Sequence, residues 1–262
     1  MSASASVDVD SSIAITDPSQ KESDKQNRID RQILRLGNLA AWLFPVLVIA
    51  ICLQVILRKS GHNQAWLDDA QWWMYGFIVT LGFSYAIITE SHVRVDVLYQ
   101  GFSQNRKIRT EIFGLGWLLM PFLILMADVM FHYGWSSFLA REGSNSPNGL
   151  HSLFILKLSL PVLFAIAAIA CGSMVYRNLR VMAAGHLYQF LIAILPGAVF
   201  LAQRVVTYAL WWGLHLLYPD LSASKIYKLP IIEHTVLYAC VLVGLIAFAS
   251  WLKTTFSQKS EV

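Results

Sequence analysis

The chain has 262 residues, of which 56% are hydrophobic and only 14% charged, and its mean hydropathy is +0.53. A soluble domain this apolar would expose large hydrophobic patches, so the composition indicates a bilayer as its solvent. The isoelectric point near 9.0 does not indicate a nucleic-acid partner, because no basic cluster carries interleaved aromatic residues. The composition favours an all-α integral membrane protein whose basic residues lie in cytoplasmic loops.

The first 34 residues are polar and rich in Ser, Asp and Lys. They have no apolar core followed by a small-residue cleavage site, so a secretory signal is not expected there. A segment with so little apolar surface cannot offset the entropy of ordering, which predicts a disordered tail. Basic residues before the first apolar run predict that this tail stays in the cytoplasm. They are Lys21, Lys25, Arg28, Arg31 and Arg35.

Apolar runs of about 20 residues, the length that crosses the hydrocarbon as a helix, recur along the rest of the chain. Four of them predict a membrane core over residues 35–180, and residues 181–262 predict an extension with about two more membrane helices. About six spans would leave both termini in the cytoplasm. The predicted spans are 39–57, 71–89, 112–133, 153–174, 198–217 and 232–252.

The fifth span is the least regular part of this pattern. Residues 187–217 are too many for one simple crossing, and Pro196-Gly197 interrupts them. This predicts a partly interfacial start followed by a span from about Ala198. A re-entrant or a surface-lying helix is the alternative.

A polar link, His92-Val93-Arg94-Val95-Asp96-Val97-Leu98-Tyr99, follows the second span. Asp96 is suited to cap a short interfacial helix over residues 97–102, and Ser103 to cap the next helix. The link therefore predicts a bend at the cytoplasmic face. Replacing Arg94 or Asp96 is expected to weaken assembly or expression of the protein.

Two charged residues, Asp128 and Lys157, lie inside predicted spans. A charge in mid-span carries a penalty of about 2.5–3.5 kcal/mol, so each needs a partner or water. Each lies about five residues inside the outer end of its span, and the two spans run antiparallel. We therefore expect an Asp128–Lys157 ion pair. In the alternative, Lys157 reaches the outer surface and Asp128 meets water or His132.

The three cysteines, Cys52, Cys171 and Cys240, lie in apolar runs without a CxxC pattern, which predicts buried packing and no disulfide or metal site. Haem-carrying bundles need histidine pairs at similar depth on facing helices. Three histidines fall near outer span ends at similar depth, so bis-histidine ligation stays open beside a plain interfacial role. They are His132, His215 and His234.

With these motifs, the chain resembles the small membrane subunit (Q-type, DctQ-like) of tripartite ATP-independent periplasmic (TRAP) transporters. The resemblance covers about residues 35–180 and includes the four-span order, with a C-terminal extension beyond it. Its motifs are the polar link with Ser103, the outer loop and the Lys157-to-Pro161 start of the fourth span. The outer-loop residues are Glu142, Ser144, Pro147, Gly149 and Leu150.

The resemblance implies a scaffold in the bacterial inner membrane beside a larger subunit that holds the sodium and substrate sites and moves as an elevator. A periplasmic binding protein would deliver the substrate, typically an organic acid. This chain itself would hold no cofactor and would not be an enzyme, and no nucleotide loop or HExxH motif occurs in it. The structural or interface candidates are Arg94, Asp96, Ser103, Asp128, Glu142, Pro147, Gly149 and Lys157.

In that role Arg94 and Asp96 would fix the bend, while Glu142 and Lys157 would order the outer loop and its helix. Two other classes of protein compete with the scaffold. One is a haem- or quinone-binding membrane anchor of a respiratory enzyme, which a Soret and α band in a reduced-minus-oxidised spectrum would reveal. The other is a stand-alone small permease. Against it, the chain shows no inverted internal repeat that would build both halves of an alternating-access site.

Overall fold

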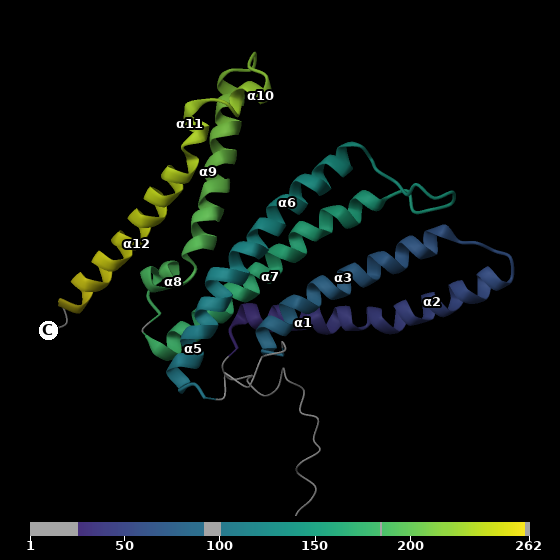
Figure 1. Cartoon of the computed structure of the whole chain (residues 1–262), viewed down its shortest axis with the longest axis horizontal. Helices are drawn as coiled ribbons and strands as arrows, with labels where there is room; N and C mark the ends of the chain where they lie inside the picture. Colours follow the sequence, from purple (N-terminus) through teal and green to yellow (C-terminus); the bar gives the residue numbers. More distant parts are fainter. Residues whose placement is uncertain (1–25, 92–100, 184, 260–262) are drawn as a thin grey trace, which may run out of the picture.

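The computed structural model describes residues 26–91, 101–183 and 185–259, and the regular elements in these ranges are helices (Figure 1). A π-helical segment, Gly114–Leu119, joins α5 to α6. The helices are α1 (Arg28–Ala41), α2 (Leu43–Lys59), α3 (Ala65–Thr89), α5 (Gln104–Phe113), α6 (Met120–Leu139), α7 (Leu153–Met182), α8 (Leu187–Ala193), α9 (Leu195–Leu217), α10 (Ala223–Ile226), α11 (Pro230–Glu233) and α12 (Thr235–Lys259).

Five helical runs in the described ranges are long and apolar enough to cross a membrane, and there are six if the bent pair α8–α9 forms one span. This confirms the predicted all-α membrane fold, with four spans before α8 and about two after it. The helices of the core are longer than predicted, because their polar ends continue the helix beyond the apolar run. The third run extends from Gln104 to Leu139 without interruption.

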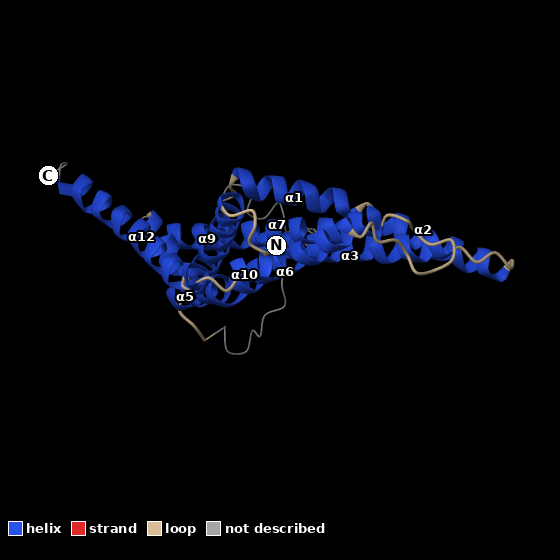
Figure 2. Ribbon diagram, turned by 90° about the horizontal axis from the view of Figure 1, so that it is seen from above, coloured by secondary structure: helices blue, strands red, loops and turns tan. Residues whose placement is uncertain are grey.

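Helix α7 is central to the core and packs against α6, α3, α5 and α1. Its small residues allow close contact, and Ala170 and Cys171 are completely buried. Isoleucines and leucines of α1, α3 and α6 complete the apolar core around them. Helix α1 lies across one face of the layer that α3 and α7 form (Figure 2).

The start of the chain corrects one prediction. The tail was expected to extend to residue 34, but α1 begins at Arg28, and Ile33 and Leu34 are buried in the core. Ile33, Leu34 and Ala40 are buried against the core, so this polar-looking segment gains enough burial to fold. Helix α1 ends where Pro45 cannot donate a hydrogen bond to the carbonyl of Ala41, and α2 begins after Trp42.

Helices α9 and α12 form a hairpin that contacts the core through α6 and through α8 (Figure 1). The predicted break in residues 187–217 is confirmed, but it lies at Ile194, and α8 and α9 meet at 94°. Pro196 lies in the first turn of α9, where its missing amide hydrogen is harmless. The α9–α12 hairpin diverges from α6 toward α10 and α11, while the start of α9 contacts the π-helical segment and the end of α12 lies away from the core (Figure 1).

Gly134 is a contact point between α6 and α7 where a side chain does not fit. A Cβ there would lie 2.7 Å from the carbonyl oxygen of Lys157, whereas one at Gly82 would meet nothing within 4 Å. Gly134→Ala is expected to destabilise the protein by about 1–3 kcal/mol through overpacking. Gly82→Ala is the control and is expected to be neutral or slightly stabilising. Unfolding in detergent measures both, and equal effects would contradict the close packing.

Candidate functional site

A buried carboxylate joins three helices at the end of the bundle where α1 begins. Asp30 has no exposed surface, and its Oδ1 accepts a 2.6 Å hydrogen bond from the hydroxyl of Ser173. Its Oδ2 lies 3.5 Å from Nη1 of Arg177. Nη2 of Arg177 lies 3.3 Å from Oε1 of Glu90 and also donates to the carbonyl of Ile88 at 3.4 Å. This Asp30 network ties α1 to α7 and to the end of α3.

A second network orders the opposite end of the bundle. Nζ of Lys157 lies 2.6 Å from Oε2 of Glu142, which also accepts a 2.7 Å hydrogen bond from the hydroxyl of Ser137. The ammonium group lies 4.5 Å from the ring centre of Tyr133. The Lys157 side chain is 15% exposed and that of Glu142 45%. The pair therefore joins the start of α7 to the loop that follows α6.

The predicted Asp128–Lys157 pair is wrong. The third span was expected to end at Tyr133, but α6 continues to Leu139. Asp128 is therefore 11 residues from the end of α6, while Lys157 is four residues from the start of α7. At 1.5 Å per residue this difference separates them by about 10 Å along the bundle. Lys157 pairs instead with Glu142, in the loop that these two residues were expected to order.

Asp128 pairs with the C-terminal extension. Its Oδ2 lies 2.9 Å from Nη2 of Arg204 on α9, and its Oδ1 accepts a 2.7 Å hydrogen bond from the hydroxyl of Tyr208. Nε2 of His132 lies 2.6 Å from the same hydroxyl and 3.3 Å from Nη2 of Arg204. This Asp128 cluster holds Arg204 against α6.

The loop between α6 and α7 contacts the start of α3. The amide of Leu150 donates a 3.0 Å hydrogen bond to Oδ2 of Asp69. The turn at Pro147 is closed by a 2.9 Å bond from the amide of Gly149 to the carbonyl of Ser146. Gly149 is buried, and a Cβ there would overlap the side chain of Ser144. The turn geometry therefore favours Pro147, the close contact requires glycine at position 149, and Asn148 between them has a positive φ of 60°.

The remaining predicted positions are less informative. Arg94 and Asp96 lie outside the described residues, so their role in the bend stays a prediction. Ser103 immediately precedes α5 with extended backbone, as expected of a cap, but its side chain makes no capping hydrogen bond. Asp30 and Arg177 are the residues that the sequence patterns missed, because Asp30 falls within the predicted tail and Arg177 lies beyond the end of the predicted fourth span, residues 153–174.

All three cysteines are free, and only Cys171 is buried, where its thiol donates to the carbonyl of Leu115 at 3.1 Å. Cys52 and Cys240 are exposed on the surface of this subunit, so the prediction that they are buried is wrong. Within the described ranges, no cluster of three or more His, Cys, Asp or Glu residues could hold a metal ion. The expectation that the chain carries no cofactor stays a prediction.

The Glu142–Lys157 pair makes the loop sensitive to pH. Hydrogen bonds from the ammonium of Lys157 and the hydroxyl of Ser137 lower the pKa of Glu142 below its ordinary value of 4.5. A lowered folded-state pKa stabilises the loop above pH 4.5, and that stabilisation disappears as the pH falls through the folded pKa. Hydrogen exchange of the loop amides, relative to their intrinsic rate at each pH, is expected to accelerate as the pH falls through the folded pKa of Glu142.

Glu142→Gln is the test of this pH dependence. The amide cannot be titrated, so the loop of the variant is expected to exchange faster than that of wild type near neutral pH and to show no acid-induced increase. Asp220→Asn, in the loop between α9 and α10, is the control for charge removal elsewhere. An acid-induced increase that persists in Glu142→Gln would show that another group is responsible.

In each network a carboxylate lies within 3.5 Å of a cation that comes from a different element. Charged side chains within or next to membrane spans are usually paired in this way. Helices that are mostly apolar, span-length and fixed by such pairs define a multi-pass membrane protein.

The particular family follows from comparison with family models. The model of "Tripartite ATP-independent periplasmic transporters, DctQ component" matches residues 47–181, more than half of the chain. The chain therefore belongs to the family of the small membrane component of TRAP transporters. The match runs from α2 to the last turn of α7 and leaves α1 and α8–α12 outside. Comparisons with curated proteins and with solved structures gave no match.

Proposed function

We propose that this chain is the scaffold beside a larger elevator-type membrane subunit in sodium-coupled uptake of an organic acid. The family match over residues 47–181 carries the proposal, because the family is that of the small component of a three-part transporter. In this family the small component works with a large membrane subunit and a periplasmic binding protein. The substrate and sodium sites would lie in the large subunit.

The geometry supports a fixed element. Ion pairs and hydrogen bonds join α1 to α7, α6 to α9 and the α6–α7 loop to α3. A moving transport domain needs elements that slide past one another, whereas these contacts hold their helices in register. The basic residues before α2 support an N-terminus in the cytoplasm and, with an even number of spans, a C-terminus there as well.

Uptake into vesicles tests the scaffold role. The large subunit is reconstituted with and without this chain, the binding protein is added outside, and labelled organic acids are supplied with a sodium gradient. We expect sodium-driven uptake only when this chain is present. Undiminished uptake by the large subunit alone would overturn the role of this chain as a required scaffold.

A further inference from the structure

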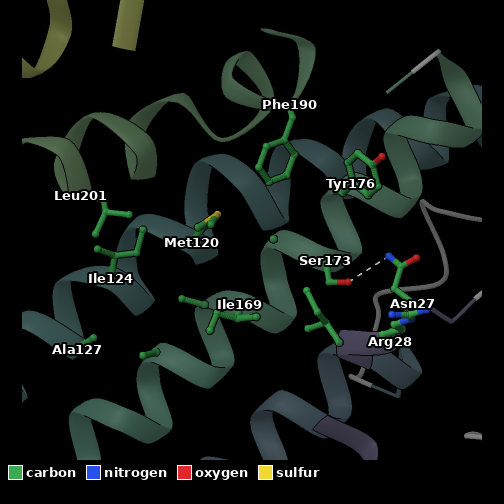
Figure 3. Close-up of a pocket in the computed structure, with 14 residues that line it drawn as sticks. Asn27, Arg28, Met120, Ile124, Ala127, Ile169, Ser173, Tyr176, Phe190 and Leu201 are labelled. Atoms are coloured by element: carbon green, nitrogen blue, oxygen red, sulfur yellow. Dashed lines mark hydrogen bonds between the residues drawn. The ribbon is translucent and has the colours of Figure 1, made fainter. Parts of the chain in front are cut away.

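An apolar groove of about 800 Å³ lies between α1, α6, α7 and the α8–α9 corner (Figure 3). Met120 and Ile124 of α6 and Ile169 of α7 line it, and Phe190 and Leu201 lie along its other side. Its volume is in the range of about 300–1,000 Å³ that is typical of ligand sites. Arg28, Phe190 and Leu201 lie outside residues 47–181, so the groove depends on parts of the chain beyond the family match.

The polar groups that line the groove gather at one end. Asn27, Arg28 and Tyr176 lie together there, whereas Ile124, Ala127 and Leu201 mark the other end (Figure 3). Arg28 is exposed and has no ion-pair or hydrogen-bond partner among the residues that the structure describes. The nearby Asp30 carboxylate is already bonded to Ser173 and Arg177. This end of the groove therefore offers the unpaired guanidinium of Arg28 to an anion.

The length of the groove fits one leaflet of a membrane. Its lining along α7 runs from Tyr176 to Ala165, 11 residues, or about 16 Å of helix. Half of a hydrocarbon core of about 30 Å has nearly the same length. A cation at one end and an apolar floor one leaflet long match the two parts of a phospholipid.

A transmembrane helix of a partner fits less well. An apolar transmembrane helix is a rigid cylinder about 10 Å wide, and it brings no anion to Arg28. Acyl chains are narrower and adapt to an irregular floor. We propose that this groove binds the acyl chains of an anionic phospholipid, with the lipid phosphate on Arg28. The bound lipid then fills the space between the core and the C-terminal extension.

Native mass spectrometry of the purified full-length chain tests the site. The protein is incubated with mixed micelles that contain equal amounts of phosphatidylglycerol and phosphatidylethanolamine. Wild type is expected to retain one phosphatidylglycerol, favoured about fivefold, as one basic residue at an anionic surface implies. Arg28→Gln is expected to lose this preference. Arg35→Gln, an exposed position on the same helix that does not line the groove, is expected to keep it.

A second pair of variants tests the apolar part. Ala165 lines the groove at an exposed position of α7, so Ala165→Trp is expected to prevent retention of either lipid. Val162→Trp, exposed on the same helix outside the groove, is expected to keep the lipid. Equal retention of both lipids by wild type, equal losses in Arg28→Gln and Arg35→Gln, or full retention by Ala165→Trp would each overturn the proposal.

Discussion

Asp30→Ala is expected to destabilise the protein by about 3–5 kcal/mol, the usual result of removing one partner from a buried ion pair. The carboxylate is fully buried and accepts from Ser173 at 2.6 Å, so its loss leaves that hydroxyl and part of the Arg177 guanidinium unpaired. It also removes the bond from the amide of Asn27 that begins α1. Unfolding in detergent, followed by tryptophan fluorescence, measures the effect.

Two further variants identify the cause. Arg31→Ala changes an exposed neighbour on the same helix and is expected to stay within about 0.5 kcal/mol of wild type. Asp30→Ala combined with Arg177→Met is expected to destabilise less than the sum of the single changes, because the two residues interact. Additive losses would show that Asp30 acts on α1 alone and that the link to α7 contributes nothing.

Asp128→Ala is expected to destabilise the contact between the core and the extension by about 2.5–3.5 kcal/mol, since it leaves Arg204 uncompensated within an apolar span. Tyr208 loses its acceptor at the same time. The extension should then separate from α6, which faster proteolysis of the loop after α9 would report alongside the loss of stability.

The double variant Asp128→Ala with Arg204→Met removes both charges and is expected to recover most of the stability, because an apolar pair of similar volume can replace a buried ion pair. Tyr208→Phe, which removes one hydroxyl, is the milder control and is expected to lose about 1 kcal/mol. If the double variant were as unstable as Asp128→Ala, the Asp128–Arg204 pair would not be what joins α9 to α6.

The spans were predictable because each depends on a local property, a run of about 20 apolar residues. The family was predictable from polar residues at the span ends. The partners of the buried charges were not, because pairing depends on the depth of each residue and on the direction in which it faces. An error of six residues in the end of α6 was enough to assign Asp128 to Lys157 and not to Arg204.

The Asp30 network was missed for a related reason. Low hydropathy around Arg28 and Asp30 predicts a tail, and only the apolar face of Ile33 and Leu34 indicates a buried helix. A periodicity of 3.6 residues across residues 28–40 is the signal that would have revealed it. The position of α9 against α6 has no comparable local signal, since it arises from packing between segments about 80 residues apart.

Co-purification is the most direct test of the central claim that this chain is a scaffold subunit. A tagged copy is extracted from its native membrane in mild detergent, and the masses of the proteins that elute with it are determined. The account predicts a stable complex with a larger multi-span membrane protein, one copy of each. Elution of this chain alone, or with a haem or flavin subunit in place of the large membrane protein, would contradict it.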